Sequence, residues 1–328
     1  MDLIYGLIAL LVTVVAAGLG FLLYCSPKPR KPTEKEQYYV DRSGKSHKLP
    51  SILDDASVRL SCIVPAFDES KRLPIMLDET IGHLESRQQK DPKFTYEIIV
   101  VDDGSRDDTV NVALKYAQKH KDVDLRVLPL EKNRGKGGAV TQGMLAARGE
   151  ICLMVDADGA TKFSDLDDLE EKLAKCEKSG YGIAVGSRSH LVSTDAVVQN
   201  YILTNHLPQR SFIRNFLMRG FHALVYFLGI RGIEDTQCGF KLFTRKAAQL
   251  IFPNMHVERW IFDIECLVIA QGHRIPITEV QVTWQEIDGS KVNLMRDSIQ
   301  MALDLLTIRL NFLLGIWKVD SIKKQKSQ

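Results

Sequence analysis

The sequence is poor in cysteine and shows no cysteine pairing pattern. Six cysteines occur in 328 residues, and none of them forms a C-x-x-C pair. A disulfide scaffold or a zinc site would need clustered cysteines or a histidine-rich partner, so neither is expected. The cysteines predicted to be reduced and structural, in a cytosolic setting, are Cys25, Cys62, Cys152, Cys176, Cys238 and Cys266.

The motifs of several common enzyme classes are also missing. No G-x-x-x-x-G-K-[ST] segment is present, and no G-x-G-x-x-G follows the first predicted strand, which argues against P-loop and nicotinamide enzymes. No Ser-His-Asp or Cys-His arrangement is suggested for nucleophilic catalysis. The formal net charge is only +2 and no basic block is interleaved with aromatic residues, so no nucleic-acid partner is expected.

Charged residues are absent from Leu3 to Tyr24. This stretch is long enough to cross a hydrocarbon core of about 30 Å. A cleaved signal peptide is the alternative, because Ala16-Ala17-Gly18 offers small residues, but the apolar run is longer than usual and no basic region precedes it. We therefore predict a transmembrane signal anchor over residues 1–25. Basic residues follow the anchor, which predicts a single-pass protein with a lumenal N-terminus and a cytosolic catalytic domain.

Residues 26–57 are predicted to be a juxtamembrane linker because they are polar and begin with prolines among basic residues. From residue 58 to about residue 292, strands alternate with helices of 10–15 residues. This alternation is typical of an α/β fold with a mostly parallel sheet flanked by helices. Strands are expected at 58–67, 96–101, 125–130, up to 156, 182–185 and 277–284.

Polar clusters follow three of these strands, at the sheet edge where open parallel sheets bind their ligands. One of them, Asp156-Ala157-Asp158-Gly159, ends a run of apolar residues abruptly. Side chains two apart on an extended chain point the same way, so Asp156 and Asp158 could hold one hard cation together with a nucleotide diphosphate. The alternative is a strand end followed by an Asp-Gly turn. The other two clusters are Asp68-Glu69 and Asp102-Asp103.

A glycine-rich segment, Gly135-Lys136-Gly137-Gly138, precedes a predicted helix. A helix N-terminus with glycines favours phosphate or another anion. From this stretch alone, a purely structural turn is equally plausible.

Two later segments are rich in apolar residues but carry charges. Residues 211–230 and 293–317 are predicted to be amphipathic helices that either lie in a membrane interface or pack in the core. Residues 318–328 form a basic, solvated tail.

Taken in order, the motifs of this chain resemble those of the family-two inverting glycosyltransferases, which have the Rossmann-like GT-A fold. The similarity covers roughly residues 58–317. The motifs that carry it are Pro65-Ala66-Phe67-Asp68-Glu69, Val101-Asp102-Asp103-Gly104-Ser105, Asn133-Arg134-Gly135-Lys136-Gly137-Gly138-Ala139, Asp156-Ala157-Asp158, Gly186-Ser187-Arg188, Asp235-Thr236-Gln237-Cys238-Gly239-Phe240-Lys241 and Gly289-Ser290-Lys291.

The resemblance is strongest to members that use dolichyl phosphate as acceptor. It implies transfer of glucose from UDP-glucose to dolichyl phosphate in the endoplasmic reticulum membrane, which gives dolichyl β-D-glucosyl phosphate for N-glycan precursor assembly. The alternatives are a mannosyltransferase that uses GDP-mannose and a non-catalytic nucleotide-sugar-binding membrane protein. Membrane lipids are expected partners, and the sequence leaves open whether the protein forms a homo-oligomer.

The resemblance also implies roles for individual residues. Residues expected to bind UDP-glucose are Pro65, Ala66, Asp68, Glu69, Asp102, Asp103, Lys136 and Asp156. Asp158, with Asp156, is expected to bind Mg²⁺ or Mn²⁺. Related mannosyl enzymes place a further glutamine ligand where this chain has Ala160.

The acceptor chemistry needs no strong base, because the second pKa of a phosphomonoester is near 6 and the phosphate is already a dianion at neutral pH. The site must instead bring two anions together. Asp263 is expected to orient a sugar hydroxyl or a cation. The catalytic residues are predicted to be Asp156, Asp158, Asp263 and Lys291. The cations expected to bind the acceptor phosphate are Arg188, Arg210, Arg214 and Lys291.

Overall fold

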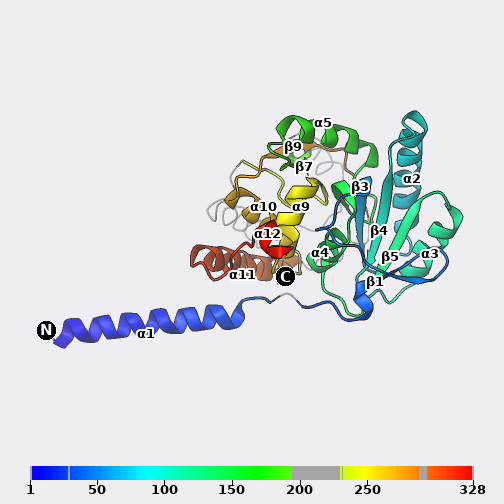
Figure 1. Ribbon diagram of the computed structural model, residues 1–328. Coiled ribbons are helices and arrows are strands. Elements are labelled where there is room, and N and C mark those ends of the chain that lie inside the picture. The colour runs from blue at the N-terminus through cyan, green and yellow to red at the C-terminus, as the bar shows by residue number, and fades with distance from the viewer. Residues whose placement is uncertain (1, 29, 194–229, 231, 288–293, 327–328) are drawn as a thin grey trace, which may run out of the picture.

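Four parallel strands with almost entirely buried side chains form the centre of the sheet. They are β3 (Val58–Ala66), β4 (Tyr96–Asp102), β5 (Asp124–Pro129) and β6 (Gly149–Val155). Long apolar runs of this kind suit strands that are covered on both faces. The computed structural model describes residues 2–28, 30–193, 230, 232–287 and 294–326 (Figure 1).

Within the described residues the sheet has nine strands in the order β2-β1-β5-β4-β3-β6-β8-β7-β9. Strand β8 runs antiparallel to both of its neighbours, and β9 runs parallel to β7. The mostly parallel α/β sheet predicted from the sequence is confirmed. The outer strands are β1 (Tyr38–Val40), β2 (Ser46–Lys48), β7 (Ile183–Ser187), β8 (Phe240–Thr244) and β9 (Ile277–Gln281).

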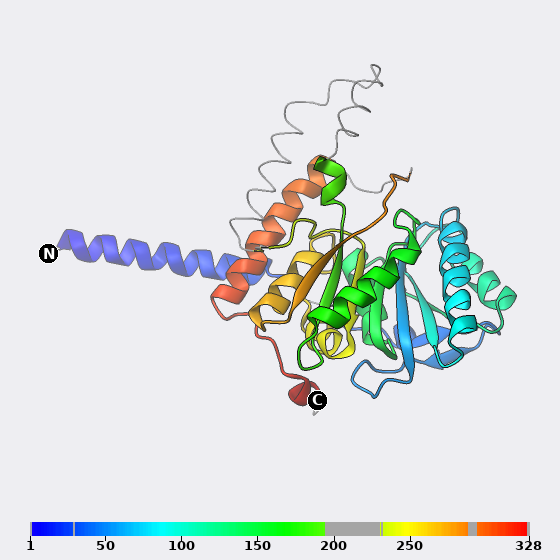
Figure 2. The ribbon, with the colours of Figure 1, turned by 90° about the horizontal axis from the view of Figure 1, so that it is seen from above.

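Helices cover both faces of the sheet (Figures 1 and 2). Their buried side chains divide into two hydrophobic clusters, one on each face. The helices α2 (Leu73–Lys90), α3 (Thr109–Lys119) and α5 (Leu166–Cys176) cover one face. The helices α4 (Lys136–Leu145), α9 (Arg245–Ile251), α10 (Phe262–Gly272) and α11 (Leu294–Leu313) cover the other. Shorter helices are η2 (Phe163–Asp165), α6 (Ser189–Ser193), η3 (Phe252–Asn254) and α12 (Ile322–Gln325).

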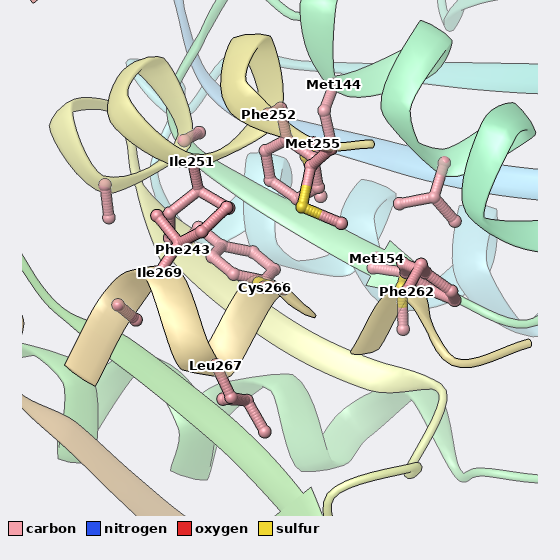
Figure 3. Close-up of a cluster of buried hydrophobic side chains, with 14 of the residues drawn as sticks. Met144, Met154, Phe243, Ile251, Phe252, Met255, Phe262, Cys266, Leu267 and Ile269 are labelled. Carbon is pink, nitrogen blue, oxygen red and sulfur yellow. The ribbon is translucent and has the colours of Figure 1, made fainter. Parts of the chain in front are cut away.

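The second face has a dense core of sulfur and aromatic side chains (Figure 3). Phe243 of β8 and Phe252 pack edge to face, with ring centroids 5.2 Å apart. Met144 of α4 and Phe262 of α10 belong to the same cluster. This packing fixes α4 and α10 side by side on the sheet, so that the N-terminal ends of both helices meet the carboxyl edge of the strands.

The five cysteines whose side chains the structure describes are free thiols, as predicted. Four of them, Cys62, Cys152, Cys238 and Cys266, are buried. Burial raises the pKa of Cys238 to about 11, which keeps this thiol protonated and unreactive.

The N-terminal residues form a separate helix, α1 (Asp2–Cys25), which extends away from the sheet (Figures 1 and 2). None of the helices in the described part of the chain meets the length and hydropathy that a membrane span requires.

Residues 26–57 differ from the linker that the sequence predicts. They contain a 3-10 helix, η1 (Lys35–Gln37), and the strands β1 and β2. Strand β1 pairs antiparallel with β5, and the guanidinium of Arg126 on β5 lies 4.6 Å from the ring centroid of Tyr39. The segment is therefore part of the folded domain, because its polar residues find partners on the edge of the sheet.

Helix α11 begins at Leu294, within one residue of the predicted start, but ends at Leu313, before the predicted end at residue 317. Leu305 and Ile308 are buried in the core, whereas Leu303 and Leu306 are 55% and 42% exposed. The expected helix at residues 211–230 lies outside the described residues.

The close packing of α4 on the sheet yields a stability prediction. A Cβ atom on Gly143 would lie 2.5 Å from Ile63 Cγ2 and 2.8 Å from Val101 Cγ2. We expect Gly143→Ala to lower the free energy of unfolding by about 1–3 kcal/mol, because the core must move to admit the methyl group.

Denaturant titration measures this change. Gly82→Ala is the matched control, since Gly82 lies in α2 with nothing within 4 Å of the added atom. That control should gain about 0.5–1 kcal/mol from helix propensity. Equal effects of the two substitutions would contradict the packing described here.

Candidate active site

A cavity of about 620 Å³ lies at the carboxyl edge of the parallel strands. The ends of β3, β4 and β6 and the N-terminus of α4 contribute to its walls, together with the segment before α10 and part of α11. Of the residues predicted to act at the site, Pro65, Ala66, Glu69, Asp103, Lys136, Asp156 and Asp158 line this cavity. The sheet therefore brings together residues that are far apart in the sequence.

Asp156 is held between a cation and a glycine. Its Oδ1 atom lies 2.6 Å from Lys136 Nζ. Because Val155 pairs with Phe240 across β6 and β8, the next residues on the two strands, Asp156 and Gly239, also lie opposite each other. A Cβ atom on Gly239 would be only 1.9 Å from Asp156 Oδ2. Only glycine leaves room for this carboxylate.

Asp158 lies on the turn that follows. Gly159 adopts a φ of 72°, so the expected Asp-Gly turn is present alongside the acid pair. The Asp158 Oδ1 atom accepts a hydrogen bond of 3.0 Å from the Ala160 backbone N–H. Burial and the nearby charge of Asp156 raise the pKa of Asp158. Two acids of like charge therefore face one cavity.

A second, deeper ion pair lies behind Asp156. Lys241 Nζ lies 2.6 Å from Asp263 Oδ1, and both side chains are almost completely buried. Burial raises the pKa of Asp263. Burial alone would lower the pKa of Lys136, but the carboxylates of Asp156 and Asp263 raise it instead. Asp263 thus pairs with Lys241 and does not line the cavity; its role in orienting a sugar hydroxyl or a cation stays a prediction.

The residues near the ends of β3 and β4 form the other wall. Glu69 accepts from Arg72 Nε at 2.7 Å, and both side chains line the cavity. Asp103 accepts hydrogen bonds from the backbone N–H groups of Arg134 at 2.6 Å and Gly135 at 2.8 Å. Burial raises the pKa of Asp103 to about 7.

Two predicted donor-binding residues point elsewhere. Asp68, at a φ of 51°, accepts a hydrogen bond of 2.7 Å from the Arg106 backbone N–H and so ties two loops together. Asp102 is 3% exposed and accepts from the Ser105 N–H at 3.2 Å. Neither side chain lines the cavity, so both support the loops around it.

The glycine-rich segment packs against protein. A Cβ on Gly137 would be 2.4 Å from Phe262 Cβ, and the Gly138 N–H donates to the Glu258 carbonyl at 2.9 Å. These glycines allow α4 to approach the segment before α10 closely, which supports the structural alternative for them. Lys136 alone turns its charged group into the cavity.

Of the cations predicted to bind the acceptor phosphate, Arg188 lies within the residues that the structure describes. It forms a two-pronged ion pair with Asp235, through Nε at 2.6 Å and Nη2 at 2.9 Å. The paired carboxylate raises the pKa of Arg188. Arg210, Arg214 and Lys291 lie outside the described residues.

Several cavity residues were not predicted as site residues. Arg72, Arg259, Trp260, Trp284 and Asp304 all line it. Trp260 and Trp284 belong to segments rich in polar residues, a signal that could have marked them as cavity residues. Asp304 lies on α11 and Arg72 directly precedes α2, and only the fold shows that their side chains face the site.

The profile of Glycosyl transferase family 2 matches residues 61–252. The chain therefore belongs to this family of glycosyltransferases, as its motifs indicated. The match includes both acids of the Asp156 and Asp158 pair and the glycine that makes room for the first of them.

Curated relatives narrow the classification to the dolichyl-phosphate beta-glucosyltransferases. The Dictyostelium discoideum protein of this name is 48% identical over 325 residues, which cover 97% of this chain and 96% of that protein. The Homo sapiens protein is 50% identical, covering 89% and 87%. The Saccharomyces cerevisiae protein is 42% identical, covering 94% and 93%. The resemblance to this group of enzymes is confirmed.

Solved structures support the fold. Glucosyl-3-phosphoglycerate synthase from Mycobacterium tuberculosis, in complex with uridine diphosphate, superposes with a TM-score of 0.53 at 15% identity and covers 77% of this chain and 80% of that one. The same enzyme with Mn²⁺ and UDP-glucose gives a TM-score of 0.51 at 18% identity, with 77% and 79% covered. At this identity the likeness concerns the GT-A-like fold.

The contact between Asp156 and Gly239 leads to a prediction about activity. We expect Gly239→Ala to push the Asp156 carboxylate away from Lys136 and to lower turnover by about 10²-fold, the usual cost of misplacing a reacting group by about 1 Å. The thermal midpoint should change little, because the displaced atoms lie at the end of a side chain in a cavity.

The control for this experiment is Gly272→Ala, where nothing lies within 4 Å of the added atom. Turnover of the control should equal that of the unchanged protein. Full activity of Gly239→Ala would mean that the position of Asp156 does not matter.

Proposed function

We propose that this enzyme transfers glucose from UDP-glucose to dolichyl phosphate with inversion at the anomeric carbon. The products are dolichyl β-D-glucosyl phosphate and UDP. The observation that carries the proposal is the acid pair Asp156 and Asp158 in a cavity at the carboxyl edge, within a chain 42–50% identical to dolichyl-phosphate beta-glucosyltransferases.

The cavity offers the donor three cations, Arg72, Lys136 and Arg259, alongside its carboxylates. We infer that the nucleoside lies against Pro65, Ala66 and Asp103, and that the diphosphate extends towards Asp158. Lys136 stays protonated, since the surrounding carboxylates raise its pKa. It holds Asp156 in place and offsets negative charge next to the sugar.

The acid pair also fits a divalent cation. Both side chains offer the oxygen atoms that Mg²⁺ and Mn²⁺ prefer, and the repulsion that helps raise the pKa of Asp158 would be relieved by a cation. Among the described side chains, no group of three His, Cys, Asp or Glu residues forms a metal site, so diphosphate and water oxygens would complete the coordination. When bound, the cation would neutralise the diphosphate as it departs.

The transfer itself requires only one displacement. An oxygen of the acceptor phosphate forms a bond to the anomeric carbon, while the bond from that carbon to the UDP oxygen breaks and its electron pair leaves with UDP. The acceptor is a dianion near neutral pH, so no side chain must remove a proton. The burial of Asp263 beside Lys241 agrees with this scheme, because no exposed base is needed there.

The lipid acceptor implies work at a membrane surface, and the proposal places it at the endoplasmic reticulum. Exposed apolar residues of α1, among them Leu7, Leu10 and Val12, are left uncovered by the rest of the domain, which supports attachment through this helix. The single-pass form of that attachment, with a cytosolic catalytic domain, remains a prediction from the sequence.

A donor comparison tests the proposed reaction. Purified protein in dolichyl phosphate-containing liposomes is offered labelled UDP-glucose, GDP-mannose and UDP-N-acetylglucosamine in separate reactions. We expect label in lipid from UDP-glucose alone, and loss of that label when a chelator is added. Label from GDP-mannose instead would overturn the donor assignment, and no label at all would favour a non-catalytic binder.

Helix α11 connects the cavity to the proposed membrane surface. Met301 and Asp304 line the cavity, whereas Leu303, Leu306 and Leu313 are exposed on the side turned from the core. Each leucine that inserts into the membrane interface would contribute about 1.5 kcal/mol to membrane binding, which is roughly a tenfold change in affinity.

In protein that lacks residues 1–25, we therefore expect Leu303→Glu and Leu306→Glu to reduce liposome flotation and dolichyl phosphate turnover by about tenfold each, with UDP binding unchanged. Ile75→Glu serves as the control, because Ile75 is 67% exposed on α2, on the other face of the sheet. An equal loss of flotation in the control would argue against a membrane-facing role for α11.

A further inference from the structure

The segment between α1 and the sheet is fastened to both walls of the cavity by buried charges. Four residues carry this contact and are called the clamp below: Arg30, Glu36, Arg134 and Glu258. Arg134 Nη2 lies 2.6 Å from Glu36 Oε2, and its Nη1 lies 3.1 Å from Glu258 Oε1. The side chains of Arg134 and Glu36 are only 3% and 2% exposed.

Glu36 is fixed within its own segment. Its carboxylate accepts a hydrogen bond of 3.0 Å from the Thr33 N–H, and the Glu36 N–H donates to Thr33 Oγ1 at 3.4 Å. This reciprocal pattern is a capping box, which holds the first turn of a helix. The same carboxylate accepts from the Glu131 N–H at 3.2 Å. Glu36 therefore faces Arg134 from a rigid turn.

The clamp contacts the first wall of the cavity through the backbone of Arg134. Its N–H and that of Gly135 donate to the carboxylate of Asp103, and the Arg30 side chain donates to the Asn133 carbonyl at 3.1 Å. Asn133, Gly135, Asp103 and the neighbouring Lys136 all line the cavity. The clamp thus sets the position of the loop that presents Lys136.

The second wall is reached through Glu258. Arg30 Nε lies 2.8 Å from Glu258 Oε2, and the Glu258 carbonyl accepts from the Gly138 N–H at 2.9 Å. The two residues after Glu258, Arg259 and Trp260, line the cavity. The four clamp residues therefore contact segments that form both walls of the donor cavity.

We propose that Glu36 and Arg30 are positioning residues for donor binding, so that the segment joining α1 to the sheet completes the nucleotide pocket. A plain tether would not bury an ion pair against the cavity loop. Taking Glu36 away leaves the buried Arg134 with Glu258 as its remaining carboxylate partner, and the loop must then shift to compensate for the lost charge. The proposal rests on the proposed function for the identity of the nucleotide.

The test uses the full-length protein and two readouts, UDP binding by calorimetry and the KM for each substrate. We expect Glu36→Gln to weaken UDP binding and to raise the donor KM by about tenfold, with the KM for dolichyl phosphate unchanged. The matched control is Lys35→Gln on the same turn. Lys35 pairs with Glu131 at 3.1 Å on the surface, and its loss should change both constants by less than about twofold.

Arg30→Gln keeps the proposal testable if Glu36→Gln fails to fold. The Arg30 side chain is 44% exposed, so this variant should fold and still raise the donor KM by about two- to fivefold, since one of the two links to Glu258 is lost. UDP affinity within twofold of the unchanged protein in both folded variants would overturn the proposal. UDP binding tests the clamp even if the unchanged protein rejects UDP-glucose as a donor, so the two proposals can fail separately.

Discussion

The ion pair between Lys136 and Asp156 is the interaction on which the site depends. Lys136 is the first residue of α4, and Asp156 follows the end of β6. Their side chains are 2.6 Å apart, and both line the cavity. The pair requires a glycine opposite Asp156 and close approach of α4 to the segment before α10. Much of the surrounding packing meets these two requirements, from Gly239 just before β8 to Gly137 against Phe262.

Charge is arranged in layers around this pair. Asp158 lines the cavity, while the buried Lys241 and Asp263 pair lies outside its lining. A buried ion pair is costly unless both members are satisfied. Here Lys241 and Asp263 satisfy each other, so neither competes for a partner in the pair formed by Lys136 and Asp156. On the far side, the clamp fastens the loop that carries Lys136.

Much of the fold could be predicted from the sequence, because β3, β4 and β6 are apolar runs that end in acids at the edge where ligands bind. Strand β8 was missed because Lys241 interrupts its short apolar run, and its charge is buried only through Asp263, a partner found in the tertiary structure. Strands β1 and β2 were missed because each has only three residues, too few to show an alternating pattern, and β2 is polar. The acid pair and Lys136 were found from their motifs, whereas the places of Arg72, before α2, and Asp304, on α11, depend on how these helices pack, which a sequence pattern does not show. Asp68 and Asp102 were predicted to contact the donor, yet neither lines the cavity, and each accepts a backbone hydrogen bond from a neighbouring loop.

The most direct test of the account is a structure of the full-length protein with UDP and Mn²⁺, measured with the anomalous signal of manganese. The account predicts one manganese peak in bonding contact with the Asp158 carboxylate and the diphosphate, with the uridine against Ala66 and Asp103 and the contact from Lys136 to Asp156 kept. A diphosphate bound away from Asp158, or manganese held by other residues, would contradict it.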